Sequence, residues 1–163
     1  MEETIVIGIA DFKLAKAPVT LVTYALGSCV GISIYDERAK IGGLAHIMLP
    51  YSSMMQHHGP ESRLKFADTG IADMLDALLH RGASKSALRA KIAGGANMFK
   101  SSATSSLSAV GMQNVESVRT TLRNLEIPII AEDTGRDYGR TVYVDMNNGE
   151  MRIRSLGNNI LVL

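Results

Sequence analysis

The chain of 163 residues contains one cysteine, no tryptophan and only 5% aromatic residues. A single cysteine excludes an internal disulfide and a cysteine-based zinc site. The scarcity of aromatic side chains argues against a stacking platform for single-stranded nucleic acid. The 17 Lys and Arg nearly balance the 16 Asp and Glu. The overall charge therefore gives no reason to expect nucleic acid or an anionic membrane as a partner.

Long hydrophobic runs are also missing from the sequence. No apolar stretch approaches the roughly 20 residues that cross a bilayer, so we expect no membrane insertion. The chain starts with acidic residues and a short apolar run, which is unlike a secretory signal, and we expect a cytoplasmic protein. The composition, 46% hydrophobic and 20% charged, is that of a globular protein. The length suits a single domain over residues 1–163.

Most of the chain has the pattern of β-strands. Runs of β-branched residues bounded by turn residues predict strands at residues 4–9, 19–26, 29–36, 41–49, 88–93, 127–132, 141–146 and 151–156, with a further edge at 160–163. Helical spacing predicts a helix over residues 60–81, which starts at Pro60 and ends at Gly82, and a second helix capped by Asn114. Many strands with two helices, and no strict alternation, indicate an α+β sandwich.

The cysteine lies on the first strand of a predicted hairpin, and a histidine lies on the second. If the loop is the two residues Glu37 and Arg38, Cys29 lies directly opposite His46 on the same face. The other face then carries the pairs Val30 with Ala45, Ile32 with Gly43 and Ile34 with Ile41. A loop one residue longer would place Cys29 and His46 on opposite faces. The predicted site therefore depends on the register of this hairpin.

A thiol beside an imidazole can act as a nucleophile with its own base. The imidazole can take the thiol proton to form an ion pair, and the imidazolium can then protonate a departing amine. Thr23, on the preceding strand, can accept a hydrogen bond from the second ring nitrogen and fix the tautomer. The tight turn at Gly27 and Ser28 exposes backbone N–H groups that suit a developing oxyanion. The pattern therefore indicates Cys29 as nucleophile and His46 as base.

Less specific interpretations of these residues stay open at this point. A free cysteine is often an inert buried residue, and a lone histidine on a strand is often only held by hydrogen bonds. His57 and His58 would point in opposite directions along an extended segment, which disfavours a metal site. Gly94 and Gly95 follow a strand but belong to no nucleotide-binding pattern, so close backbone packing explains them better.

Several motifs resemble those of the CheD family, the chemoreceptor glutamine deamidases of bacterial chemotaxis. They are VTYALGSCV at residues 22–30, GLAHIMLP at 43–50, KFAD at 65–68, KIAGGANMF at 91–99, GMQN at 111–114 and AEDTG at 131–135. They follow the family order over nearly the whole chain, and jointly they are highly specific. The resemblance implies the same three residues as the spacing: Cys29 as nucleophile, His46 as base and Thr23 as the residue that orients it.

The resemblance also implies a fold, a reaction and partners. The fold is a three-layer α/β sandwich similar to the deamidase domain of cytotoxic necrotizing factor toxins. The reaction is hydrolysis of selected glutamines to glutamates on the cytoplasmic helices of methyl-accepting receptors, through a cysteine thioester and without a metal or organic cofactor. In many such systems the protein also binds CheC, a phosphatase of the response regulator, which inhibits the deamidase.

Some positions depart from the family pattern, and other functions remain open. Arg136 stands where a second glycine is usual, Gln113 replaces an arginine, and the serine-rich stretch after Phe99 is longer than usual. These differences bear on substrate or partner contacts. The alternatives to a deamidase are a non-catalytic adaptor that binds receptors or CheC, a transglutaminase that transfers the same acyl group to a lysine amine, and a redox sensor. The absence of a second cysteine disfavours the sensor.

Overall fold

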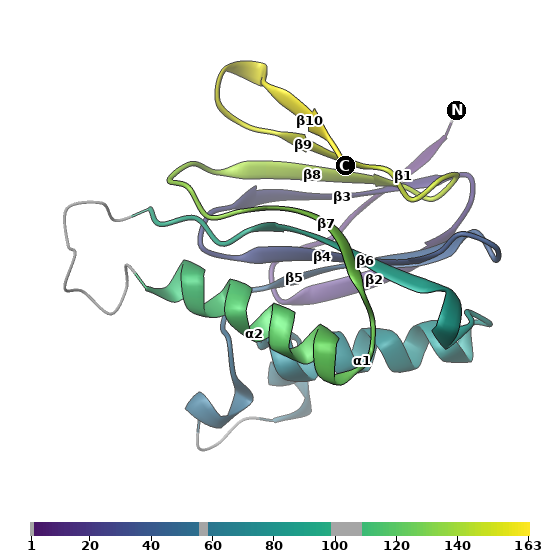
Figure 1. Ribbon diagram of the computed structural model, residues 1–163, viewed down its shortest axis with the longest axis horizontal. Coiled ribbons are helices and arrows are strands. Elements are labelled where there is room, and N and C mark those ends of the chain that lie inside the picture. Colours follow the sequence, from purple (N-terminus) through teal and green to yellow (C-terminus); the bar gives the residue numbers. More distant parts are fainter. Residues whose placement is uncertain (1, 56–58, 99–108) are drawn as a thin grey trace.

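The computed structural model describes residues 2–55, 59–98 and 109–163, which form three stacked layers (Figure 1). Two β-sheets lie face to face, and helices cover the outer face of one of them. The first sheet contains, in spatial order, β1 (Glu3–Val6), β3 (Val19–Leu26), β8 (Arg140–Asp145), β9 (Met151–Arg154) and β10 (Ile160–Val162). The second contains β2 (Asp11–Lys16), β5 (Ile41–Ile47), β4 (Val30–Asp36), β6 (Leu88–Gly94) and β7 (Ile129–Thr134).

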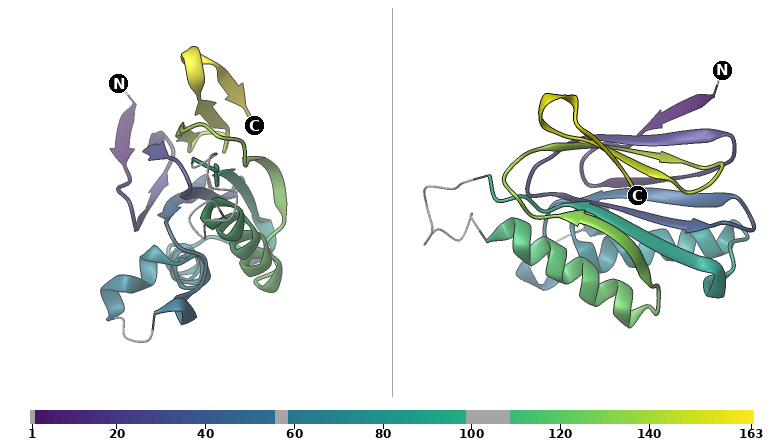
Figure 2. Two further views of the ribbon diagram at one scale, coloured as in Figure 1. Left: turned by 90° about the vertical axis from the view of Figure 1, so that its left-hand side faces the viewer. Right: turned by 45° about the horizontal axis from the view of Figure 1, so that its top comes forward.

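Both sheets are mixed, because each contains one parallel pair beside antiparallel pairs. The parallel pairs are β1 with β3 in the first sheet and β6 with β7 in the second. Two main helices, α1 (Ala67–His80) and α2 (Val110–Asn124), contact each other beneath the second sheet (Figure 2). The predicted α+β, three-layer architecture is therefore confirmed.

The first predicted helix is confirmed over most of its length. Its expected first turn, Pro60–Lys65, is a separate 3₁₀ helix that precedes α1. Gly82 follows α1 with a φ of +99°, a left-handed conformation that ends a helix readily only at glycine. Short 3₁₀ turns also occur at Ser52–Met54, Lys85–Ala87 and Leu156–Asn158.

Two apolar clusters bind the three layers together. The cluster between the second sheet and the helices includes Val30, Ile32, Ile34, Ile47, Ile71, Leu78, Val118 and Leu122. The cluster between the two sheets includes Leu21, Leu26, Leu44, Val142, Val144 and Met151. Successive side chains of a strand point to opposite faces, so strands of the second sheet contribute to both clusters. Cys29 packs against the cluster between the sheets.

The loop between β4 and β5 is longer than predicted, and the register of this hairpin differs. Asp36 pairs with Ile41, so the loop is residues 37–40, and Gly31 rather than Cys29 lies opposite His46. The predicted apolar pairs are also wrong. The observed pairs are Val30 with Ile47, Ile32 with Ala45 and Ile34 with Gly43.

The Asp36 side chain explains the longer loop. Its Oδ1 accepts hydrogen bonds from the backbone N–H groups of Arg38 and Ala39, both at 3.0 Å. An aspartate that binds the backbone two residues on forms an Asx-type turn, which competes with a two-residue hairpin loop. Lys40 closes the loop with a φ of +54°.

The observed register of β4 and β5 differs from the predicted one by two residues, so each side chain still lies on its predicted face of the sheet. Side chains alternate with a period of two, so a shift of two returns each residue to its predicted side. Val30, Ile32 and Ile34 indeed face the helices. His46 faces the first sheet, and the chain direction of β4 places Cys29 diagonally beside it on the same side.

One strand was not predicted, and some predictions lie outside the described residues. β2 pairs along the whole of β5 and forms an edge of the second sheet. The serine-rich loop predicted at residues 100–108 and the adjacent histidines 57 and 58 lie outside the described ranges. Within those ranges, no helix has both the length and the apolar character needed to span a membrane.

Candidate active site

Cys29 lies in the turn that carries the chain from the first sheet to the second. This nucleophile turn, Gly27, Ser28 and Cys29, connects the end of β3 with the start of β4. Cys29 is partly exposed. The predicted nucleophile therefore lies at an accessible end of the space between the sheets.

His46 and Thr23 meet across the gap between the two sheets. His46 belongs to β5 of the second sheet and Thr23 to β3 of the first. The Oγ1 of Thr23 lies 2.7 Å from Nδ1 of His46, a hydrogen bond between two fully buried residues. The structure thus brings the two predicted residues together, although their strands belong to different sheets.

The hydrogen bonds of Thr23 determine the tautomer of His46. A threonine hydroxyl has a single proton to donate. Thr23 donates it to the backbone carbonyl of Ile7, at 2.9 Å, because a carbonyl can only accept. The hydroxyl must then accept from His46, which assigns the ring proton to Nδ1. Nε2 of a neutral His46 is therefore unprotonated and carries the free lone pair that a base requires.

The Nε2 atom of His46 is buried and has no hydrogen-bond partner within the described residues. His46 as a whole is 1% exposed. An unpaired buried polar atom costs about 1–3 kcal/mol, so it is uncommon where a side chain serves only to stabilise the fold. His46 pairs with Gly31, two residues after Cys29, so a free ring nitrogen on this strand is compatible with a general base.

Burial shifts both groups of the pair toward their neutral forms. Desolvation lowers the pKa of His46 to about 4. Desolvation also raises the pKa of the Cys29 thiol, and a hydrogen bond from its own backbone N–H offsets part of this rise. Both shifts favour a neutral thiol and a neutral imidazole over the ion pair expected from the sequence, because burial disfavours the charged form of each group.

The low pKa of His46 makes the fold less stable in mild acid. Between pH 6.5 and about 4 the unfolded chain binds a proton at this ring and the folded chain does not. Stability should therefore fall as the pH drops through this window, by at most about 3 kcal/mol. Urea unfolding at pH 7 and pH 4.5 measures the loss. His46→Gln should reduce this loss of stability, whereas His80→Gln, at an exposed position, should leave the loss unchanged. An equal loss in the unchanged protein and both variants would show that His46 does not cause it.

All three carbonyl groups of the nucleophile turn are held by donors from other segments. The N–H of Ala96 donates to Gly27 at 2.9 Å, and the N–H of Gly95 donates to Cys29 at 2.8 Å. The Ser28 carbonyl accepts from a side-chain amide at 2.8 Å. In the part of the chain that the structure describes, the N–H groups of Ser28 and Cys29 donate to no backbone or side-chain acceptor of another residue. The N–H of Ser28 is thus available to an external oxyanion, whereas that of Cys29 would first have to leave its own sulfur.

The glycine pair after β6 allows the close approach of this backbone. A Cβ atom on Gly94, whose φ is +115°, would lie 2.3 Å from the carbonyl oxygen of Cys29. A Cβ atom on Gly95 would lie 2.2 Å from a methyl group of Val115 and 2.9 Å from the carbonyl oxygen of Gly111. The interpretation of Gly94 and Gly95 as residues of close packing is confirmed.

Asn114 has a different place from the one predicted. It was expected to cap a helix, but α2 begins earlier, at Val110, and Asn114 is fully buried within it. Its Nδ2 is the donor to the Ser28 carbonyl, and it also donates to the carbonyl of Met48 at 3.1 Å. The sequence signal for this role is weak, because the buried face of α2 carries the polar residues Ser117 and Thr121 as well as apolar ones.

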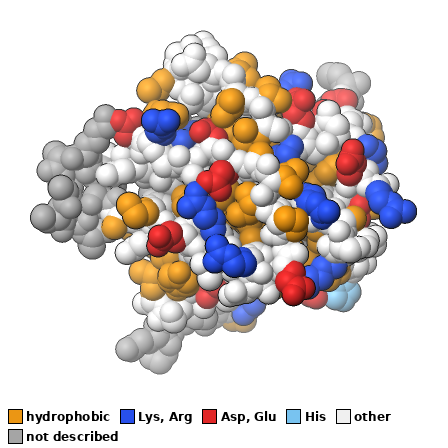
Figure 3. Space-filling view, viewed as in Figure 1, with side chains coloured by type: hydrophobic (Ala, Val, Ile, Leu, Met, Phe, Trp, Pro, Cys, Tyr) orange, Lys and Arg blue, Asp and Glu red, His pale blue; other side chains and the backbone are white. Residues whose placement is uncertain are grey.

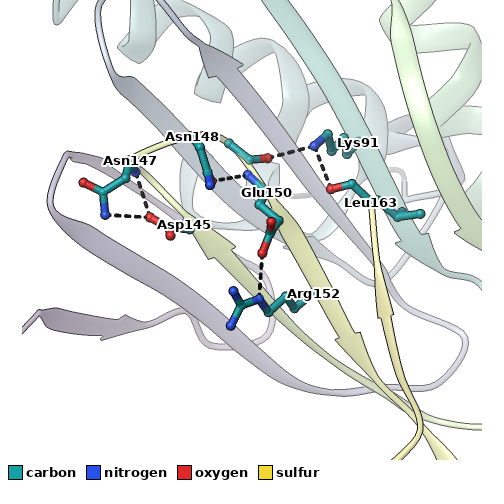
Figure 4. Close-up of polar contacts among 8 residues, drawn as sticks. Lys91, Asp145, Asn147, Asn148, Glu150, Arg152 and Leu163 are labelled. Carbon is teal, nitrogen blue, oxygen red and sulfur yellow. Dashed lines mark hydrogen bonds and ion pairs between the residues drawn. The ribbon is translucent and has the colours of Figure 1, made fainter.

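Other polar groups of the molecule are bonded among themselves. Figure 4 shows Lys91, whose Nζ donates to the backbone oxygens of Gly149 and Leu163 at 3.0 and 2.9 Å. Nearby, Arg152 pairs with Glu150 at 2.7 Å. The contacts of Lys91 tie the C-terminal segments to β6, and the pair of Arg152 with Glu150 lies within the C-terminal segment itself. No cluster of metal-ligating side chains occurs among the described residues, and Figure 3 shows charges of both signs interspersed over one face.

Comparison with known proteins places these features in a family. The family described as CheD chemotactic sensory transduction matches residues 48–155. A protein of Moorella thermoacetica is 49% identical over 96% of this chain and 93% of its own. Proteins of Lachnoclostridium phytofermentans and Caldanaerobacter subterraneus are 45% and 44% identical, over 96% and 94% of each chain. All three carry the name "Probable chemoreceptor glutamine deamidase CheD".

A solved structure is also similar in part. The Bacillus licheniformis hypothetical protein YfiH superposes with a TM-score of 0.49 at 18% identity, over 76% of this chain and 50% of that one. This likeness is too weak to bear on fold or function.

Proposed function

The chain belongs to the CheD family, and we propose that it deamidates glutamine side chains of methyl-accepting chemotaxis receptors to glutamates. Residues 1–163 act as one deamidase domain in the cytoplasm. Cys29 is the nucleophile, His46 the general base and acid, and Thr23 the residue that orients His46. The names of the relatives support the reaction and the receptor substrate.

The observation that carries the proposal is the hydrogen-bond state of His46. Thr23 accepts from Nδ1–H, and the buried Nε2 lone pair has no partner among the described residues. A histidine that serves only the fold would have both ring nitrogens bonded. Here one nitrogen is fixed and the other is free among the described residues, and His46 pairs with Gly31, two residues after the partly exposed Cys29.

The proposed reaction has two half-reactions of acyl transfer. Because the resting pair is neutral, Nε2 of His46 takes the thiol proton as the sulfur of Cys29 attacks the carboxamide carbon. The imidazolium gives this proton to the leaving nitrogen, the C–N bond breaks, and ammonia departs from a thioester. His46 then removes a proton from water, which attacks the thioester carbon. The C–S bond breaks, and His46 returns the proton to the sulfur.

The nucleophile turn suits the charge that develops in both half-reactions. The tetrahedral intermediates carry a negative oxygen, and among the described residues the N–H groups of Ser28 and Cys29 donate to no backbone carbonyl. We propose that these two groups, with the backbone of Gly27, form the oxyanion site. The steps need only the side chains named and water, so the proposal includes no cofactor.

A surface groove beside the turn offers a path for the substrate. It runs from Gly95 past Met112 and Val115 to Thr134 and Arg136. Met112 is 67% exposed, and methionine suits adaptable protein contacts. We propose that the receptor segment next to the target glutamine lies in this groove, so that Arg136, a departure from the family pattern, affects substrate choice. CheC is a proposed partner through the same receptor-binding surface.

Deamidation of a receptor fragment tests the proposal. The purified chain is incubated with the cytoplasmic fragment of a receptor from the same organism, and ammonia and the intact mass of the fragment are followed together. Each converted glutamine should release one ammonia and replace one amide by a carboxylate. Ammonia release with a lysine-linked product would indicate transglutamination. Binding of the fragment with neither change would indicate an adaptor and overturn the proposal.

A further inference from the structure

One buried side chain joins the segment that carries the nucleophile to the segment that carries the base. The amide of Asn114 uses both of its protons. One is donated to the carbonyl of Ser28, the residue before Cys29, at 2.8 Å, and the other to the carbonyl of Met48, two residues after His46, at 3.1 Å. These two carbonyl groups lie 20 residues apart in the sequence and accept from the same amide nitrogen.

We infer that Asn114 is a positioning residue, which sets the Cys29 thiol against Nε2 of His46. The inference rests on the proposed deamidation. β4 and β5 already pair Gly31 with His46, but Cys29 lies beyond the last paired residue of β4. The turn that holds Cys29 is attached to the residues after β6 by Gly95 and Ala96, but its link to the end of β5 is Asn114. The two N–H groups of a single planar amide nitrogen provide this link.

Packing alone explains Asn114 poorly. The residue is fully buried, and its Oδ1 has no hydrogen-bond partner within the described residues. A buried amide with an unpaired oxygen is less favourable than an apolar side chain of similar size. The buried face of α2 carries apolar residues, Val115 and Val118, and a second polar one, Ser117, whose hydroxyl has a hydrogen-bond partner. The polar side chain at this position is therefore better explained by the two carbonyl groups that it holds.

Ser117 offers a matched comparison on the same face of α2. It is also fully buried, and its hydroxyl donates to the carbonyl of Pro50 at 2.5 Å. It thus binds the segment that follows β5, as Asn114 does, but within the described residues its hydroxyl makes no hydrogen bond to the nucleophile turn. Removal of either side chain should weaken the attachment of α2 to the segment that follows β5. Only removal of Asn114 should move Cys29 relative to His46.

The test compares Asn114→Leu and Asn114→Ala with Ser117→Ala. Leucine fills the volume of asparagine but has no hydrogen-bond donors. Asn114→Leu therefore avoids the cavity that Asn114→Ala would leave, and it should fold even if Asn114→Ala does not. For each protein we measure kcat and KM for ammonia release from the receptor fragment, the melting temperature, and the rate of Cys29 alkylation by iodoacetamide at several pH values. Cys29 is the only cysteine, so alkylation reports on this thiol alone.

Asn114→Leu should lower kcat about 30- to 100-fold, because a small misplacement of reacting groups costs about that much. KM should stay within about twofold, since the receptor groove is untouched. The released thiol should gain contact with water and be alkylated faster at a given pH. Ser117→Ala should keep kcat within about threefold.

Two results would overturn the inference. One is a kcat for Asn114→Leu within about threefold of the unchanged protein; the other is an equal loss of kcat in Ser117→Ala at an equal melting temperature. Failure of the proposed function has a different signature, because the unchanged protein would then release no ammonia. In that case the alkylation rates still decide: faster alkylation in Asn114→Leu alone supports the role of Asn114 in holding the turn, and equal rates refute it.

Discussion

Replacement of Cys29 by alanine should abolish ammonia release from the receptor fragment, with a loss of at least about 10³-fold. The reason is specific to this site. The thioester requires a sulfur on the nucleophile turn, and the chain has no second cysteine to supply one. A hydroxyl in its place is a far weaker nucleophile, so Cys29→Ser should lose activity nearly as completely as Cys29→Ala. Ammonia release and the mass of the fragment give the measurement.

The fold and the binding of substrate should survive this change. Cys29 is only partly buried, so its removal should cost within about 1 kcal/mol of stability, which a urea titration can verify. Binding of the receptor fragment should stay within a few fold of the unchanged protein. Ammonia release above about 1% of the original rate in a well-folded Cys29→Ala protein would remove Cys29 from the mechanism.

The faces of the β4–β5 hairpin were predictable, whereas its register was not. Side chains alternate between the two faces of a strand. A register shift of two residues therefore leaves Cys29 and His46 on the same face of the sheet. The loop length depends on which groups the Asp36 carboxylate binds. That carboxylate also accepts from the N–H of Ser84, at 2.8 Å, a residue distant in the sequence. Such a contact is settled only when the chain is folded.

The change of sheet between β3 and β4 carries no clear signal in the sequence. Ala25 has a φ of +59°, and the pairing of β3 with β8 shifts between Thr23 and Leu26. This bulge bends the end of β3, and the chain then crosses to the second sheet through the nucleophile turn. An alanine with a positive φ is uncommon, and the residues around Ala25 do not predict this conformation. The pairing of Thr23 with His46 could be predicted from the sequence. That the two residues belong to different sheets and meet across the space between them could not.

The part played by Asn114 could not be predicted for a similar reason. Asparagine is common at the start of helices and unfavourable within them, so a cap is the natural expectation. Its acceptors belong to Ser28 and Met48, which precede it by 86 and 66 residues. The glycines 94 and 95 were interpretable, because a pair of glycines has few explanations other than a turn or a close approach. Polar side chains have many partners available, and sequence alone does not choose among them.

Replacement of His46 by glutamine should lower kcat about 10²- to 10⁴-fold, the usual contribution of a general acid and base. Glutamine keeps a polar group of similar reach, but it cannot take the thiol proton or return it to ammonia. Since burial raises the pKa of Cys29, no preformed thiolate compensates for the missing base, and activity in His46→Gln should increase as the pH rises. The unchanged protein should hold its activity down toward the pKa of His46, about 4, wherever it stays folded.

Thr23→Val is the matched control for this prediction, because it leaves the ring in place and removes the acceptor of Nδ1–H together with the hydrogen bond to Ile7. The imidazole can then adopt the other tautomer, with its proton on Nε2 and no lone pair toward the thiol. We expect a loss of about 10- to 100-fold, smaller than that of His46→Gln, and a recovery in Thr23→Ser, which restores the hydroxyl. A loss in Thr23→Val without recovery in Thr23→Ser would instead assign Thr23 to packing between the sheets, and His46 would then act without a fixed tautomer.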